Sequence, residues 1–200
     1  MANFNRIASS YDFLKKIIFG EQIEKATNHF LNQMPSNSKI LIVGGGTGKI
    51  LGNFDSSQVI KYLELSKAMI NRANEVKSNA TIEFIQSDIL EWTSNEKYDF
   101  VITPFFLDCF NEDQLNSIFL KLKNVLNKKG KWIQTDFYPK NKAQVLMIKI
   151  MYAFFILSTN LKTKELANFD LFFEKHQFLL LRKALFYHSM VESKIYQNIG

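Results

Sequence analysis

Short apolar runs alternate with segments of helical periodicity along the middle of the chain. The runs are rich in β-branched and aromatic residues and predict five strands, at residues 40–43, 59–63, 81–86, 98–103 and 131–137. Helical spacing marks residues 67–77. Asn111, with Gln114 three residues later, predicts a capped helix that ends near Lys128-Lys129-Gly130. This alternation predicts a mostly parallel sheet with helices on both faces.

The two ends of the chain differ from this middle part. Residues 3–34 predict two helices separated by Gly20. Beyond the last core strand, residues 143–157 are apolar nearly all round, 164–176 predict a helix, and 178–187 with 190–196 predict an antiparallel hairpin. A membrane span needs roughly 20 apolar residues, so we expect no stable membrane insertion. We predict a single domain over 1–200, with a helical cap at 1–38, a core at 39–137, and further helices and the hairpin at 138–200.

A glycine-rich turn directly follows the first predicted strand, at Gly44-Gly45-Gly46-Thr47-Gly48, and Ile50-Leu51 continues as a helix would. A strand–turn–helix of this kind lets the backbone approach a ligand closely. The dinucleotide fingerprint G-x-G-x-x-G would need glycine where Lys49 stands. Glu64 ends the second strand about 20 residues after Gly44, where an acid can bind a ribose diol. Ligands of such sheets bind at the switch point of strand order, which predicts a site formed by 44–48 and 103–108.

The amino-acid composition limits the kinds of partner that the chain is expected to bind. The formal net charge is +6 and the pI is about 9.2, but only three residues are arginines and the lysines are scattered. Arginine reads phosphates and bases better than lysine, so we interpret the charge as a solvated surface and predict no nucleic-acid partner. Cys109 is the single cysteine, which excludes an intramolecular disulfide and predicts no metal site. No signal peptide opens the chain, and we expect a cytoplasmic protein.

Over residues 4–197 the chain resembles class I S-adenosylmethionine-dependent methyltransferases. The matching motifs are Gly44 to Gly48, Glu64, Ser87-Asp88-Ile89, Tyr98 to Ile102, and Lys128 to Lys131. Residues 4–12 are also similar to the opening of quinone-biosynthesis-type methyltransferases. The resemblance implies an α/β fold: a Rossmann-like, doubly wound, seven-stranded, mostly parallel sheet with a C-terminal antiparallel hairpin and N-terminal helices. It also implies S-adenosyl-L-methionine as the cofactor and methyl transfer to a small molecule.

The same resemblance assigns roles to individual residues. The backbone of Gly44, Gly45, Gly46, Thr47 and Gly48 would approach the methionine and ribose parts of the cofactor. Glu64 would accept hydrogen bonds from both ribose hydroxyls, and Leu65 would pack on the adenine. Asp88 would accept from the adenine amine, the Ile89 N–H would reach a ring nitrogen, and Thr103 would line the methionine end. The family usually has an acidic residue two positions before the first glycine, where this chain has Ile42.

The sequence says less about the methyl acceptor and the residues that would bind it. A general base is needed only for a poorly nucleophilic acceptor, and the candidates near strand ends are Asp108, Asp136 and Tyr138. We expect an apolar or aromatic acceptor between the run 145–157, Tyr11 and the Phe105-Phe106 loop. The alternatives for that run are a core helix covered by the hairpin, a membrane-surface helix, and a homodimer contact. Two other functions stay open: a non-catalytic cofactor-binding protein and a nucleotide-dependent oxidoreductase.

Overall fold

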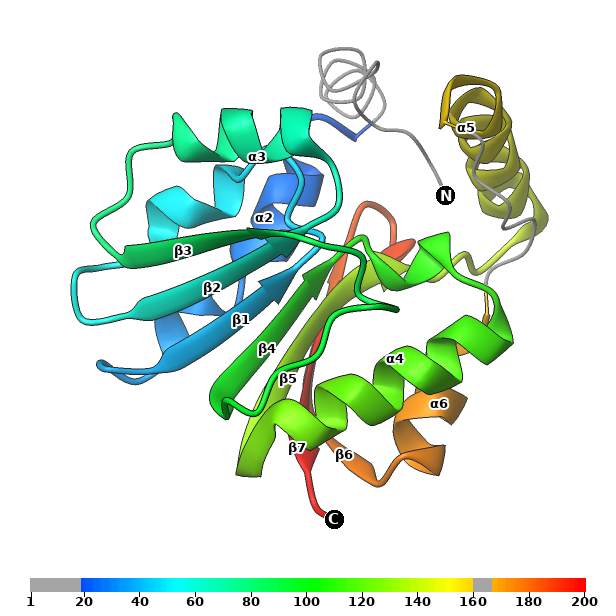
Figure 1. Ribbon diagram of the computed structural model, residues 1–200. Coiled ribbons are helices and arrows are strands. Elements are labelled where there is room, and N and C mark those ends of the chain that lie inside the picture. Colours follow the sequence, from blue (N-terminus) through cyan, green and yellow to red (C-terminus); the bar gives the residue numbers. More distant parts are fainter. Residues whose placement is uncertain (1–18, 160–166) are drawn as a thin grey trace.

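A seven-stranded mixed sheet forms the centre of the molecule (Figure 1). The computed structural model describes residues 19–159 and 167–200, and of residues 152–159 the backbone alone. Within these residues the strand order is β3-β2-β1-β4-β5-β7-β6. The strands are β1 (Lys39–Val43), β2 (Val59–Glu64), β3 (Thr81–Gln86), β4 (Tyr98–Pro104), β5 (Leu126–Phe137), β6 (Phe178–Phe186) and β7 (Val191–Asn198). Strands β1 to β5 are parallel, and β7 runs antiparallel between β5 and β6. The predicted fold class is confirmed.

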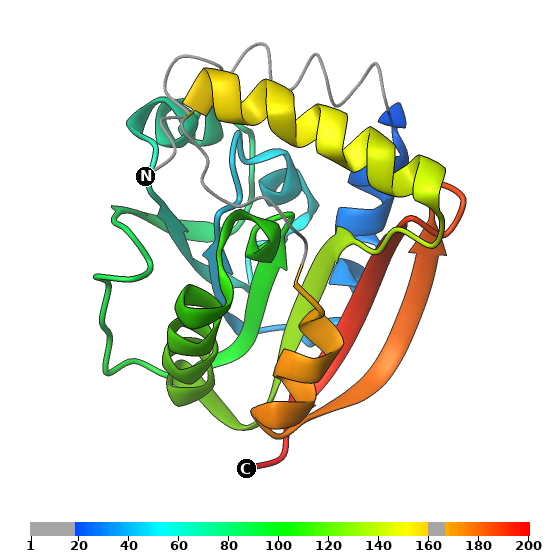
Figure 2. The ribbon, with the colours of Figure 1, turned by 90° about the vertical axis from the view of Figure 1, so that its right-hand side faces the viewer.

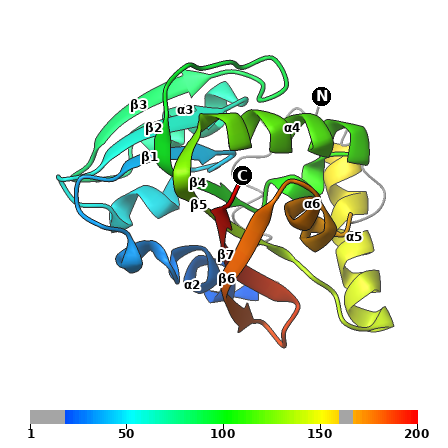
Figure 3. The same cartoon turned by 90° about the horizontal axis from the view of Figure 1, so that it is seen from below.

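Helices cover both faces of the sheet (Figures 1 and 3). Helices α4 (Glu112–Val125) and α6 (Phe169–Lys175) pack on one face. The other face carries α2 (Gln22–Asn28), the short 3-10 helices η2 (Leu31–Gln33) and η3 (Lys49–Asn53), and Ala73 of α3 (Lys67–Asn74). Helix α5 (Lys142–Thr159) crosses the carboxyl ends of the parallel strands (Figure 2), and η4 (Leu107–Cys109) follows β4.

Apolar packing on both faces explains the uninterrupted apolar run of β1. Leu41 and Val43 belong to the cluster beneath α4 and α6, whereas Ile40 and Ile42 belong to the cluster on the opposite face. Burial on both faces is what such a run predicts for a parallel strand. At the centre of the first cluster, Trp132 of β5 is fully buried against aromatic rings, with Phe119 of α4 at 4.8 Å between ring centroids.

The segment after the glycine turn is not an α-helix. The 3-10 helix η3 begins after Gly48, whose φ is +76°, and it ends before Phe54, which is extended. Phe54 is buried in the core, so the chain must leave the helix there to reach β2. The helical continuation predicted from Ile50-Leu51 is therefore a short 3-10 helix, in which both residues are buried.

The junction between α4 and β5 was also predicted incorrectly. The capping box of Asn111 and Gln114 is present, but α4 ends at Val125 and β5 begins at Leu126. Leu126 pairs with Tyr98 of β4, and a register shift brings Lys131 opposite Phe100. Residues Lys128-Lys129-Gly130 therefore belong to an irregular strand start instead of a helix end, and Lys129 has a φ of +61° there.

The flanking segments follow the predictions in part. The second amino-terminal helix is split into α2 and η2, and the first lies outside the described residues apart from its end. Helix α5 spans the predicted 143–157, and the terminal hairpin of β6 and β7 is confirmed. The helix predicted at 164–176 is α6, and residues 160–166 are outside the description.

Candidate functional site

The carboxyl ends of five parallel strands meet at one edge of the sheet. Strand β1 lies between β2 and β4, so the chain after β1 crosses to one side and the chain of β4 and β5 lies on the other. This is the topological switch point at which open α/β sheets bind their ligands. The glycine turn, Glu64, Asp88 and the segment after β4 all come to this edge, as the sequence predicts.

Tyr62 supports the glycine turn from beneath. Its hydroxyl donates to the Gly46 carbonyl at 3.0 Å, and the side chain is fully buried. A Cβ on Gly45 would overlap the Tyr62 ring, so the turn and the tyrosine fit only without a side chain at Gly45. Burial raises the pKa of Tyr62 well above its ordinary value, and the phenol stays a neutral donor. Tyr62 was not predicted as a site residue, although its alternation with Ile60 places both on the same face of β2.

Gly44 and Gly46 have different surroundings. Both have positive φ angles, but a Cβ on Gly44 would overlap the ring of Phe106, from the segment after β4. A Cβ on Gly46 would meet no atom of the described residues within 4 Å. Gly44 is therefore required by the protein's own packing, whereas Gly46 borders open space. That is the geometry expected where a ligand approaches the backbone closely.

Glu64 faces the turn from the end of β2. Its Oε1 accepts from the Ser66 amide at 2.9 Å and its Oε2 from the Gly46 amide at 3.2 Å. Burial raises the pKa of the carboxyl, while the backbone amides of Ser66 and Gly46 act in the opposite direction. A carboxylate oxygen accepts two hydrogen bonds, so each has capacity for one more. The group fits the two hydroxyls of a ribose. Leu65, beside it, is 37% exposed.

The remaining predicted cofactor contacts fall into two groups. Asp88 follows β3 and accepts from the Leu90 amide at 3.0 Å, and Ile89 is buried next to it. Thr103, in contrast, is fully buried, and its hydroxyl accepts from the Trp132 indole at 2.8 Å. The side chain of Thr103 thus ties β4 to β5 and is turned toward the core.

Asp108 and Asp136 form an acidic pair where β4 and β5 end. Asp136 is fully buried, and its Oδ1 accepts from the Phe137 amide at 3.0 Å. Its Oδ2 has no hydrogen-bond partner among residues 19–151 and 167–200. Asp108 is in η4 and is 6% exposed. Burial, and next the charge of Asp108, raise the pKa of Asp136 well above its ordinary value.

A buried polar network continues from this pair along β5 and β7. The Tyr138 hydroxyl donates to Gln134 at 3.0 Å, and the ammonium of Lys194 lies 3.5 Å from the centre of the Tyr138 ring. Lys194 is buried between Glu192, at 2.9 Å, and Asp170, at 2.6 Å. Tyr138 is a candidate from the sequence, whereas Gln134 and Lys194 carry no local signal, because their burial depends on cross-strand pairing and on α6.

Phe105 and Phe106, predicted to lie on the acceptor side, are both in this region. Phe105 is buried against Phe137, with ring centroids 4.9 Å apart, and has a φ of +51°. Phe106 is half-buried and contacts Phe110. Tyr11 lies outside the described residues.

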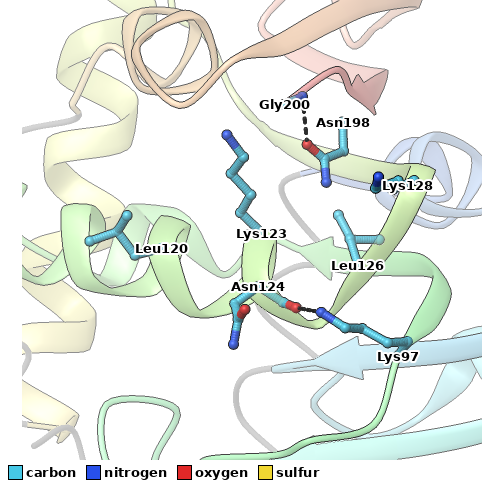
Figure 4. A pocket seen from close by; sticks show the side chains of 8 residues that line it. All are labelled: Lys97, Leu120, Lys123, Asn124, Leu126, Lys128, Asn198 and Gly200. Atoms are coloured by element: carbon cyan, nitrogen blue, oxygen red, sulfur yellow. Dashed lines mark hydrogen bonds between the residues drawn. The ribbon is translucent and has the colours of Figure 1, made fainter.

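A hollow lies at the opposite edge of the sheet, beside the starts of β4 and β5 (Figure 4). Its volume is about 330 Å³, and its lining includes Lys97, Lys123 and Lys128. Lys97 donates to the Asn124 carbonyl, and Lys123 donates to Gln177 at 2.8 Å. Lys97 and Lys123 thus serve the protein's own contacts, and the hollow lies at the end of the strands opposite the glycine turn.

Two features are absent from the described part of the chain. No group of three or more histidine, cysteine or acidic side chains there could hold a metal ion. Among the same residues, no helix has the length and apolar character needed to cross a membrane.

Known proteins similar to this chain give evidence beyond the geometry of the site. Residues 40–130 match a family model described as a methyltransferase domain. A malonyl-[acyl-carrier protein] O-methyltransferase of Acetivibrio thermocellus is 32% identical over 117 residues, which are 55% of this chain and 40% of that protein. The match thus spans less than half the length of that relative.

Solved structures share the fold at low identity. The DhpI–SAH complex is 14% identical with a TM-score of 0.71, covering 98% of this chain and 93% of that chain. The complex between the Haloferax volcanii Trm112 methyltransferase activator and a putative methyltransferase is 10% identical with a TM-score of 0.74, covering 100% and 99%. Residues 40–130 are thus similar to a methyltransferase domain, and the solved structures share the fold of nearly the whole chain, which agrees with the resemblance.

Substitutions at Gly45 and Gly46 distinguish a glycine needed for packing from a glycine needed for ligand approach. We expect Gly45→Ala to lower the free energy of unfolding without cofactor by about 1–3 kcal/mol, because the new methyl group overpacks against Tyr62. Gly46→Ala should cost about 1–2 kcal/mol for its positive φ and should also reduce the rise in melting temperature on adding S-adenosyl-L-methionine. Thermal melts with and without cofactor measure both the loss of stability and the cofactor-induced rise in melting temperature. An unchanged cofactor-induced shift in Gly46→Ala would contradict this placement.

Asp136 should make stability depend on pH. Its pKa is raised in the folded protein, so above about pH 4 the unfolded chain loses this proton while the folded chain keeps it. The free energy of unfolding should therefore fall as pH rises, by at most about 1.4 kcal/mol per pH unit, until the folded-state pKa is reached. We expect Asp136→Asn to lose this slope and the exposed Asp113→Asn to keep it. Denaturant unfolding between pH 4 and 8 measures the difference, and equal slopes in both variants would refute the assignment.

Proposed function

We propose that the chain binds S-adenosyl-L-methionine at the switch point and transfers its methyl group to a small apolar or aromatic acceptor. The observation that carries the cofactor part is the position of Glu64, which faces Gly46 across the turn with capacity for a ribose diol. The methyltransferase-domain match over residues 40–130 supports the same proposal.

In this proposal, each residue of the site contacts a different part of the cofactor. Glu64 holds the ribose, Leu65 offers a partly exposed apolar surface to the adenine, and Asp88 accepts from its amine. The open side of Gly46 admits the backbone-facing part of the ligand. When bound, the cofactor supplies an activated methyl group on a good leaving group, so the protein has mainly to align the reactants.

The position of helix α5 supports the proposal that the acceptor is apolar. The helix crosses the carboxyl edge, and its buried face, Ile148 and Met151, packs in one cluster with Phe105. Met147 borders that buried face and is half-buried, whereas Leu146 points away and is 59% exposed. We propose that the acceptor lies beside Met147 and the half-buried Phe106. Tyr11, which the sequence places beside the acceptor, lies outside the residues that the structure describes.

Glu64 provides the direct test of cofactor binding. Glu64→Gln keeps the size of the side chain but loses its charge and one acceptor, and we expect S-adenosyl-L-methionine to bind about 1.5–3 kcal/mol more weakly. Isothermal titration calorimetry measures this. Glu174→Gln, on the exposed side of α6, is the matched control and should bind like the wild type. Equal affinities of the two variants would remove the ribose assignment, and absence of binding to the wild type would refute the proposed function.

The acceptor is tested by turnover. The wild type should transfer labelled methyl to hydroxylated aromatic compounds in preference to small charged acceptors. Met147→Gln should raise the KM for such an acceptor several-fold without changing cofactor affinity, whereas Leu146→Gln, next to it on the exposed face, should change neither. Turnover with charged acceptors alone would contradict the apolar site. Cofactor binding without turnover on any acceptor class would favour a non-catalytic binding protein.

A further inference from the structure

Buried polar atoms that lack a partner are concentrated on one strand of the sheet. Within residues 19–151 and 167–200, four buried side-chain atoms have no hydrogen-bond partner, and two of them, Nε2 of Gln134 and Oδ2 of Asp136, belong to β5. Both side chains are fully buried. A polar group that leaves water without finding a partner destabilises the fold, so such atoms mark places where another molecule completes the hydrogen bonding.

The two side chains share one face of β5 near its carboxyl end. Gln134 and Asp136 alternate with Trp132, which belongs to the cluster beneath α4 and α6. Their cross-strand partners on β7 are Lys194 and Glu192. Residues two apart on a strand are separated by roughly 7 Å. An amide and a carboxyl at this spacing can reach the same small group of a ligand.

The hydrogen bonds that the two groups make determine which atom of each is left over. The Tyr138 hydroxyl donates to Oε1 of Gln134 at 3.0 Å, so the amide nitrogen is the end without a partner among the described residues. The Phe137 amide donates to Oδ1 of Asp136 at 3.0 Å, which leaves Oδ2. Both groups are thus oriented by residues close to them in the chain.

The protonation of Asp136 sets the hydrogen-bonding character of the pair. Burial first, and then the charge of Asp108, raise the pKa of Asp136 well above its ordinary value. A protonated carboxyl has one donor, and because Oδ1 accepts from Phe137, that donor is at Oδ2. The Gln134 amide nitrogen is also a donor. Two donors suit one oxygen with two lone pairs, and the charge of Asp108 favours a neutral oxygen over an anionic one.

We propose that Gln134 and Asp136 bind a carbonyl oxygen of the methyl acceptor. The inference rests on the proposed function and deepens it, because it restricts the apolar or aromatic acceptor to compounds that carry a neutral carbonyl group. Phe106, beside which the acceptor is proposed to lie, packs against the same cluster as Trp132 and Tyr138. An apolar body at Phe106 and a carbonyl at the end of β5 therefore fit one molecule. Gln134 and Asp136 act as specificity-determining residues.

Calorimetry with two phenols of similar shape tests this pairing. 3-Hydroxyacetophenone carries a neutral carbonyl oxygen, and 3-isopropylphenol has a methyl group in place of that oxygen. The wild type, saturated with S-adenosyl-L-homocysteine, should bind the ketone about three- to tenfold more tightly, as for the net gain of a hydrogen bond. Equal affinities, or binding of neither phenol, would mean that the two buried atoms meet only water, and would overturn the inference.

Substitutions on β5 separate recognition of the carbonyl from folding of the strand. Gln134→Met keeps the length of the side chain without its donor and should remove the preference for the ketone. Asp136→Leu should do the same, whereas Asp136→Asn should keep the preference, because its amide nitrogen donates where the protonated oxygen did. Thr135→Val is the matched control. Thr135 lies between the two residues on the opposite face of β5, where its hydroxyl meets that of Ser193, and the variant should bind both phenols like the wild type.

Three results with these variants would overturn the inference. They are loss of the preference in Asp136→Asn, a retained preference in Gln134→Met, and an equal loss in Thr135→Val. The wild type and Asp136→Asn suffice for the comparison of the two phenols if Gln134→Met or Asp136→Leu does not fold. Wild-type protein that binds neither S-adenosyl-L-methionine nor S-adenosyl-L-homocysteine would instead refute the proposed function, so the two failures are distinguishable.

Discussion

The whole site depends on close packing of side chains against the backbone of the glycine turn. Tyr62 hydrogen-bonds to Gly46 from beneath, Phe106 packs on Gly44, and Ala73 of α3 packs on Gly48. These contacts come from the β2 side, the β4 side and the covering helix. They fix the turn from three sides, and among the described residues the side of Gly46 is left open. A ligand can therefore meet a rigid backbone surface that needs little reordering on binding.

Strand β5 connects the apolar core to the acidic pair. Trp132, Gln134 and Asp136 alternate onto one face of the strand, in that order from the centre of the sheet to its carboxyl edge. Trp132 packs among aromatic rings and also donates to Thr103, Gln134 accepts from Tyr138, and Asp136 reaches the edge. Polarity thus increases along one strand, from the largely apolar centre of the sheet to its carboxyl edge.

The sequence predicted those features that have local signals. The run of β1, the glycine turn, Glu64 at its spacing and the capping box of Asn111 each depend on residues near one another in the chain. The start of β5 was predicted incorrectly because Leu126 is fixed by pairing with Tyr98, which no local pattern shows. The buried Lys194 and the proximity of Asp108 to Asp136 likewise depend on strand register and on α6. Periodicity alone therefore cannot predict them.

The insertion of β7 between β5 and β6 also affects how the site folds. The contact between Gly46 and Glu64 joins residues 18 apart, whereas the hydroxyls of Thr135 and Ser193, 3.0 Å apart across β5 and β7, are separated by 58 residues. Closing the longer loop has the larger entropic cost, and pairings distant in sequence slow folding. The ribose side of the site can therefore assemble from neighbouring segments. The surroundings of Asp136 are complete only when the hairpin docks, and until then this strand edge is open to pairing with other chains.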